Sequence, residues 1–147
     1  MDQPREAPPA GNVRVLFVDD EPATREGFRR SMQALGFQVD VARDAREALS
    51  KAEAAVYGVV ATDWLLPDIQ GPQLIRLLKE KNPNASYILL TGARTIGLGD
   101  GPAMREAAAV LSKPWSNDEM RTVLETAIAM HLERSGTSAE GTGPQID

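Results

Sequence analysis

The feature that most constrains the fold of this chain is a series of short apolar runs, each ending at a polar or charged residue. Their length and their nearly continuous apolar content are typical of strands buried in a parallel sheet. In open α/β sheets the carboxyl ends of the strands form the edge at which ligands bind. The runs at about 13–18, 58–61, 87–90 and 109–112 lead into Asp19 and Asp20, Asp63, Thr91 and Lys113, respectively.

Helix signals separate these runs. An alternating run at 37–41 predicts one further, more exposed edge strand. A short, less regular helix is expected between Pro102 and Ala108. Together the segments form five β–α units and predict an α/β fold with a doubly wound, five-stranded parallel sheet. The starts of the other helices are marked by Pro22, by the capping pairs Asp44/Glu47 and Ser116/Glu119, and by Gly71-Pro72.

The strand order cannot be read directly from the apolar pattern, but the distribution of polar residues favours one of the two common orders. The flavodoxin-like order 2-1-3-4-5 places the first strand beside the third. This order would bring Asp19 and Asp20 next to Asp63. We therefore expect the 2-1-3-4-5 order.

Composition excludes several classes of function. The chain has no cysteine, so disulfides, thiolate metal sites and cysteine nucleophiles are excluded, and its single histidine, His131, is expected at the surface of the last helix. The formal net charge of −5 argues against nucleic-acid binding by this domain. No apolar run approaches the ~18 residues that a membrane span needs. We expect a cytoplasmic protein that binds neither nucleic acid nor membrane.

The residues expected at the carboxyl edge suggest phosphoryl transfer. Three carboxylates in close proximity repel one another unless a cation intervenes, and Mg²⁺ is the hard cation that carboxylate and carbonyl oxygens suit. Lys113 would add a second positive group and Thr91 a hydroxyl donor. This combination can stabilise the charge of a transferring phosphoryl group. Asp63 is then the natural nucleophile.

These motifs resemble those of the response-regulator receiver domain of two-component signalling. The resemblance covers roughly residues 13–132, and the 22-residue step from Thr91 to Lys113 also fits the family. The matching segments, in family order, are Val18-Asp19-Asp20-Glu21, Asp63 with Leu66-Pro67-Asp68-Ile69-Gln70-Gly71, Thr91-Gly92, and Lys113-Pro114-Trp115.

The resemblance implies a role for each site residue. Asp63 would accept phosphate from a histidine kinase or a histidine phosphotransfer protein. Asp20, Asp63 and the backbone carbonyl of Leu65 would bind Mg²⁺, with Asp19 acting through water. Lys113 would pair with the phosphoryl group, and the Thr91 hydroxyl would move to bond it. The domain would not be an enzyme in the usual sense, although it would catalyse its own phosphoryl transfer and dephosphorylation.

The chain departs from the family where receivers convey their signal. Val110 stands where many receivers carry an aromatic switch residue, Glu106 replaces a usual glycine, and glycines interrupt the segment 92–101. These departures concern the readout rather than the phosphorylation chemistry. Our hypothesis is that the signal passes from Thr91 into the segment 92–108. The downstream partner is not indicated, and a phosphorylation-dependent dimer is left open.

Two other interpretations remain open. The chain could be a metal-dependent phosphotransferase or phosphatase that uses Asp63 on small substrates, or a degenerate receiver that acts as a constitutive interaction domain. A division into a disordered segment at 1–12, a receiver domain at 13–132 and a flexible tail at 133–147 is expected. Whether the receiver stands alone or is a fragment of a longer regulator is also left open.

Overall fold

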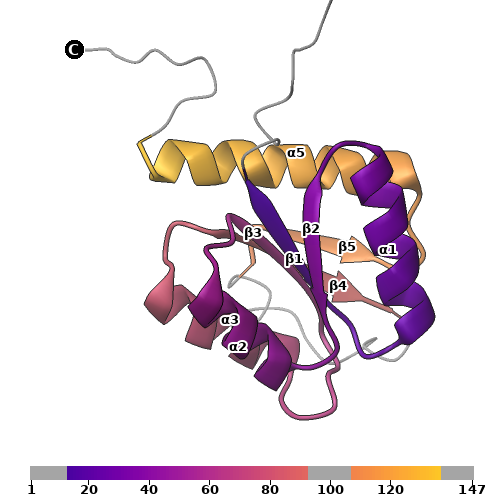
Figure 1. Ribbon diagram of the computed structural model, residues 1–147, viewed down its shortest axis with the longest axis horizontal. Helices are drawn as coiled ribbons and strands as arrows, with labels where there is room; N and C mark the ends of the chain where they lie inside the picture. The colour runs from indigo at the N-terminus through magenta and orange to yellow at the C-terminus, as the bar shows by residue number, and fades with distance from the viewer. Residues whose placement is uncertain (1–12, 93–106, 137–147) are drawn as a thin grey trace, which may run out of the picture.

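The computed structural model describes residues 13–92 and 107–136. The predicted disordered segment 1–12 and the glycine-rich segment 93–101 lie outside these ranges, as do most of the short helix and tail expected at 102–108 and 133–147. Within them, all strand pairs are parallel and the strands follow the order β2-β1-β3-β4-β5, which confirms the predicted fold (Figure 1). The strands are β1 (Arg14–Val18), β2 (Gln38–Ala42), β3 (Val59–Asp63), β4 (Ser86–Thr91) and β5 (Ala109–Ser112).

The helices begin at the predicted signals. Asp44 accepts a hydrogen bond from the Glu47 amide, and Ser116 and Glu119 form a reciprocal capping box. Gly36, just after the first helix, has a φ of 100°, a conformation that glycine adopts readily. The helices are α1 (Pro22–Ala34), α2 (Ala45–Ala54), α3 (Gly71–Lys81) and α5 (Asn117–Arg134).

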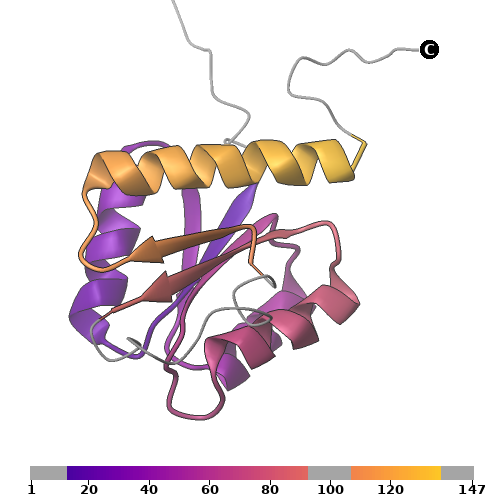
Figure 2. The same ribbon diagram turned by 180° about the vertical axis from the view of Figure 1, so that it is seen from behind.

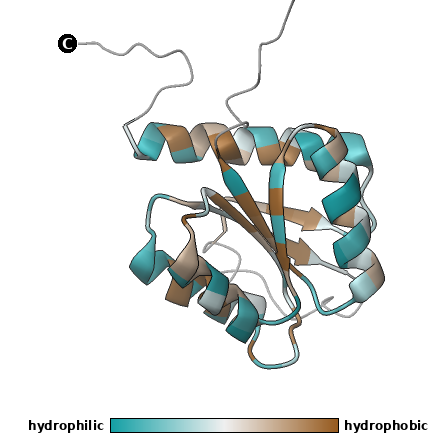
Figure 3. Ribbon diagram, viewed as in Figure 1, coloured by the Kyte–Doolittle hydropathy of each residue, from teal (hydrophilic) through white to brown (hydrophobic). Residues whose placement is uncertain are grey.

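Among the described residues, two helices cover each face of the sheet. Helices α1 and α5 pack on one face and α2 and α3 on the other, as the front and back views show (Figures 1 and 2). The strands between them are largely hydrophobic, because helices cover both faces of the sheet and exclude water from them (Figure 3). None of the helices in the described ranges is long and apolar enough to cross a membrane.

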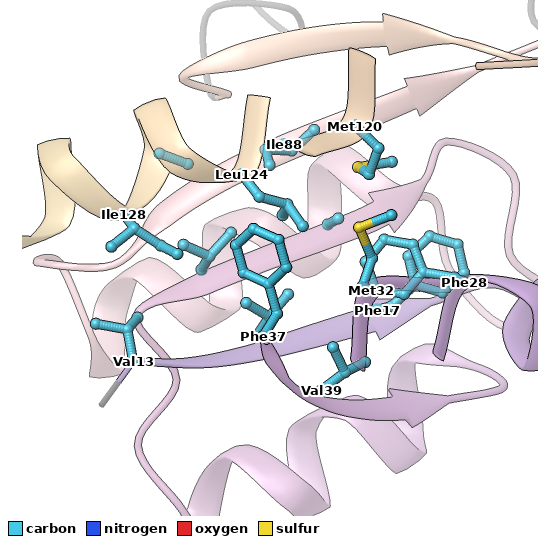
Figure 4. Close-up of a cluster of buried hydrophobic side chains, with 14 of the residues drawn as sticks. Val13, Phe17, Phe28, Met32, Phe37, Val39, Ile88, Met120, Leu124 and Ile128 are labelled. Atoms are coloured by element: carbon cyan, nitrogen blue, oxygen red, sulfur yellow. The ribbon is translucent and has the colours of Figure 1, made fainter. Parts of the chain in front are cut away.

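Alternation along the strands divides the core into two clusters. In β1, Val15 and Phe17 face α1 and α5, whereas Leu16 and Val18 face α2 and α3. On the first face, the ring of Phe17 stacks on that of Phe28 with centroids 3.9 Å apart. Figure 4 shows this cluster, in which Met120, Leu124 and Ile128 of α5 point toward the strands.

Some boundaries and environments differ from the expectations. Strand β3 extends through Asp63, because its pairing with β4 continues to that residue, whereas the apolar run ends at Ala61. Helix α5 reaches Arg134, beyond residue 132, where the domain was predicted to end. His131 is expected at the surface and is partly exposed, but it is not free: its Nδ1–H donates to the Asn84 carbonyl at 2.8 Å.

Candidate functional site

Asp63 is the last residue of the central strand β3. It is 8% exposed, and the hydrogen bond from the Trp64 amide to the Leu90 carbonyl (2.9 Å) extends the contact with β4 past it. A loop at 64–70 follows, and helix α3 begins at Gly71, whose amide donates to the Trp64 carbonyl at 2.7 Å. The sheet therefore fixes the Asp63 backbone, while its carboxylate lies at the edge.

Asp19 and Asp20 follow β1, the strand beside β3. Asp19 is fully buried; its Oδ1 accepts a hydrogen bond from the Glu21 amide at 2.9 Å. Its backbone carbonyl accepts a second one, from the Arg25 guanidinium at 2.8 Å. Asp20 is exposed, and no described residue donates a hydrogen bond to its carboxylate. Asp19 is thus fixed through both its carboxylate and its backbone carbonyl, whereas the Asp20 carboxylate is open.

Lys113 joins the two strand ends. Its Nζ lies 2.8 Å from Asp19 Oδ2 and 3.1 Å from Asp63 Oδ2. The lysine follows β5, and its amide donates to the Thr91 carbonyl at 2.7 Å, so its backbone is fixed to the end of β4. The peptide bond between Lys113 and Pro114 is cis. The structure therefore brings together Asp19, Asp63 and Lys113 as predicted from the strand ends.

The site is short of positive charge. Burial raises the pKa of Asp63 above its ordinary value, and the hydrogen bond and charge of Lys113 offset this only in part. For Lys113 the balance is reversed: burial disfavours its ammonium, but Asp19 and Asp63 outweigh burial and raise its pKa. One ammonium is thus shared between two buried carboxylates.

The donor set suits a hard divalent cation. A carboxylate oxygen from each of Asp19, Asp20 and Asp63 lies within 4.8 Å of the others. All three residues offer oxygen ligands, and the open carboxylate of Asp20 can attract a cation that keeps several of its water ligands. The chemistry of the residues therefore fits Mg²⁺.

The other two predicted site residues lie at the same edge in less defined roles. Thr91 ends β4 and is partly exposed; among the described residues its hydroxyl makes no hydrogen bond to Asp19, Asp63 or Lys113. Leu65 begins the loop after Asp63, and its backbone amide is close enough to the Asp63 carboxylate to lower the pKa of that group. Its carbonyl therefore belongs to a peptide chain held close to the acidic cluster.

Two residues at this edge were not predicted to act in the site. Arg25 binds the Asp19 carbonyl across six residues, and Asp68 bonds to the start of α2 across 22 and 23 residues. No local sequence signal distinguishes Arg25 from the other arginines of α1. Asp68 stands in a recognised motif, but its partner depends on the path of the loop.

Comparison with known proteins decides the family. The family model described as the response regulator receiver domain matches residues 15–125, most of the chain. The chain belongs to the response regulator receiver domain family. The five-stranded sheet with the strand order β2-β1-β3-β4-β5 agrees with this membership.

Curated relatives of this receiver domain are longer proteins. Transcriptional regulatory protein TrcR of Mycobacterium tuberculosis is 31% identical over 138 residues, covering 89% of this chain and 52% of TrcR. Response regulator MprA of Mycolicibacterium vanbaalenii is 33% identical over 136 residues, covering 89% of this chain and 54% of MprA. The chain thus spans about half the length of these two relatives.

A solved structure supports the same assignment. Response regulator TrrA of Thermotoga maritima, in complex with Mg²⁺-BeF, matches with a TM-score of 0.70 and 28% identity, covering 78% of this chain and 98% of TrrA. The likeness therefore extends over nearly the whole of that protein.

Proposed function

We propose that this receiver domain accepts a phosphoryl group on Asp63 from a histidine kinase or a histidine phosphotransfer protein, with Mg²⁺ as the metal. The observation that carries the proposal is the Lys113 ammonium, held at 2.8 Å from Asp19 and 3.1 Å from Asp63 beside a third carboxylate. The Mg²⁺-BeF complex of TrrA, a related receiver, supports the choice of metal.

The chain's own residues would carry the chemistry. A carboxylate oxygen of Asp63 forms the new P–O bond while the P–N bond of the donor phosphohistidine breaks, and the electron pair of that bond returns to the imidazole. Asp19, Asp20, Asp63 and the Leu65 carbonyl would bind the metal, which supplies positive charge against the phosphoryl oxygens. Lys113 pairs with one phosphoryl oxygen and the Thr91 hydroxyl donates to another.

The state of Asp63 would then control a partner. TrcR is named as a transcriptional regulatory protein, and this chain spans about half of it. We therefore propose that the receiver reports its phosphorylation to a separate output, either elsewhere in a longer regulator or in another protein. Catalysis of its own phosphorylation and dephosphorylation, without turnover of a small substrate, is part of this proposal.

Exposure to acetyl phosphate and Mg²⁺, followed by intact mass measurement, tests the proposal. We expect one phosphoryl adduct on the wild type and none on Asp63→Asn. The matched control is Asp44→Asn, since asparagine caps a helix about as well as aspartate and this residue lies outside the acidic cluster. It should be labelled like the wild type.

Other outcomes select the alternatives. Consumption of acetyl phosphate without an adduct would favour a metal-dependent phosphatase or phosphotransferase. No reaction at all, with the protein folded and Mg²⁺ present, would favour a constitutive interaction domain. An adduct that persists in Asp63→Asn would place the acceptor elsewhere and overturn the assignment.

A further inference from the structure

Asp68, in the middle of the loop after Asp63, connects that loop to a different helix. Its Oδ1 accepts a hydrogen bond from the Ala45 amide at 3.1 Å, and its Oδ2 accepts one from the Arg46 amide at 2.9 Å. Its Oδ1 also accepts the Ile69 amide at 3.0 Å. These backbone bonds lower the pKa of Asp68 against the opposing effect of burial, so the group is a carboxylate at neutral pH.

Helix α2 consequently has two caps of different origin. Asp44, the residue before the helix, caps it locally through the Glu47 amide at 2.8 Å. Asp68 satisfies two other amides of the first turn from 22 and 23 residues away in sequence. The first cap stabilises only the helix, whereas the second also fixes the position of the loop.

The loop has few other polar anchors. Two hydrogen bonds fix its ends: the Trp64 amide donates to the Leu90 carbonyl, and the Gly71 amide donates to the Trp64 carbonyl. Between these ends, the bonds of Asp68 to α2 are the loop's only hydrogen bonds to that helix among the described residues. The same stretch includes Leu65, whose backbone amide lies near the Asp63 carboxylate and lowers its pKa.

We propose that Asp68 is a positioning residue for the metal-binding and phosphoacceptor site. By fixing the middle of the loop to α2, it sets where the Leu65 backbone stands relative to Asp63, and removing it should weaken Mg²⁺ binding rather than only loosen the fold. This inference rests on the proposed function, because it presumes that the acidic cluster binds Mg²⁺. The inference adds to the proposed function a residue outside the acidic cluster that affects how tightly the cluster binds Mg²⁺.

The test compares two aspartates that cap the same helix. Mg²⁺ is titrated into Asp68→Ala, Asp44→Ala and the wild type, with tryptophan fluorescence as the signal because Trp64 adjoins Asp63. Removing a group that orients a metal ligand typically costs 10–100-fold in affinity, so Asp68→Ala should raise the Mg²⁺ Kd by about 10-fold. Asp44→Ala should lose stability and keep the wild-type Kd, since its cap does not touch the loop.

A metal-free readout accompanies the titration. In chelator, Asp68→Ala should speed hydrogen exchange at the Leu65 and Ile69 amides, and Asp44→Ala should speed it only within the first turn of α2. Asp68 is exposed, so its replacement opens no hole in the core. Asp68→Asn, which keeps the shape but turns an amide N–H toward one of the backbone donors, serves as a second variant and should give an intermediate Kd.

The outcomes separate this inference from the proposed function. A wild-type chain that gives no Mg²⁺ signal and no phosphoryl adduct would overturn both. A wild type that binds Mg²⁺, with Asp68→Ala binding equally well, would overturn the role of Asp68 and leave the function intact. Equal losses of affinity in Asp68→Ala and Asp44→Ala would also overturn it, because general loosening of α2 would then explain the effect.

Discussion

The two edges of the sheet are built from different kinds of polar contact. Near the amino edge, the buried and partly buried polar groups have hydrogen-bond partners within the protein. The Tyr57 hydroxyl donates to Asp40 at 2.6 Å, and Arg134 of α5 donates to the Ala85 carbonyl at 3.1 Å and to Ser86 Oγ at 3.0 Å. At the carboxyl edge, the ammonium of a single residue, Lys113, serves two buried carboxylates and a third stays open.

This difference indicates what each edge contributes. Buried polar groups that have their partners stabilise a structure, whereas a surplus of one charge is costly until a ligand supplies the opposite charge. The amino edge therefore needs no ligand to be stable. The carboxyl edge is arranged to gain stability when a cation arrives, and this gain provides the link between structure and proposed function.

The largest expected effect comes from removing Lys113, whose ammonium lies between the Asp19 and Asp63 carboxylates at the carboxyl edge. In chelator, Lys113→Met should lower the free energy of unfolding by about 2–3 kcal/mol, less than for a fully buried pair because the lysine side chain is 27% exposed. Mg²⁺ should then stabilise this variant more than the wild type. Chemical denaturation with and without Mg²⁺ measures both effects.

A lysine at the other edge provides the control. Lys81 pairs with Glu53 at 2.9 Å, but both side chains are largely exposed, so Lys81→Met should cost less than about 1 kcal/mol and leave the Mg²⁺ response unchanged. If Lys113→Met were no more damaging than Lys81→Met, the contrast between the two edges would not stand.

Two glycines sharpen the same contrast. A Cβ on Gly71 would collide with the Asp63 backbone oxygen, whereas one on Gly58 would meet side chains, 2.5 Å from Val13 Cγ1 and 2.6 Å from His131 Cδ2. Either Gly→Ala change should destabilise the fold by about 1–3 kcal/mol through overpacking. Only in Gly71→Ala does the new methyl group lie against the Asp63 backbone.

Labelling by acetyl phosphate distinguishes the two variants. Because a displacement of about 1 Å can cost 100-fold in rate, Gly71→Ala should slow labelling by at least about tenfold. Gly58→Ala, compared at a temperature where both are folded, should be labelled at the wild-type rate. Equal labelling of the two variants would show that the close approach of Gly71 does not position Asp63.

A smaller effect is expected from the tyrosines of the amino edge. Tyr57→Phe removes a hydrogen bond to a carboxylate and should cost about 1.5 kcal/mol, while Tyr87→Phe, whose hydroxyl donates to the Asn82 carbonyl, should cost about 1 kcal/mol. Thermal or urea unfolding measures both. Labelling of Asp63 should not change in either variant, and a loss of labelling would mean that the edges are not independent.

The sequence predicted the carboxyl edge well because the relevant information is local. Each apolar run ends at or close to the carboxyl end of its strand, and the parallel register then aligns these ends. Val18 pairs with Thr62 in neighbouring strands, so Asp19 and Asp63 follow at the same level. Thr91 pairs with Ser112, which brings Lys113 to the same edge. Fold and cluster both follow from this one pattern.

The remaining contacts could not be predicted, because they depend on the course of the loops and on how the helices pack rather than on local sequence patterns. Asp68 reaches α2 only because the loop after Asp63 bends toward that helix, and a 23-residue separation leaves no periodic signal. Similarly, His131 looks like a surface residue on its own helix. It is half-buried because Gly58, which has no side chain, lets α5 approach the amino edge closely.

The smallest expected effect concerns pH and follows from the raised pKa of Asp63. Burial raises this pKa above the ordinary 3.8, so the folded state binds the proton more tightly than the unfolded state does. Ionising Asp63 therefore costs folding free energy as pH rises from 3.8 through the raised value. In chelator, Asp63→Asn should match the wild type in acid and become the more stable protein toward neutral pH.

Asp68, at the same edge, should show the opposite sign. Its pKa is lowered in the folded state by backbone hydrogen bonds that outweigh burial, so its carboxylate contributes stability that is lost as pH falls from 3.8 through the lowered value. Asp68→Asn should thus fall further below the wild type as pH rises toward neutral. Urea unfolding of both variants across this range measures the two slopes. Slopes of the same sign would mean that the shortage of positive charge at the carboxyl edge does not act through Asp63.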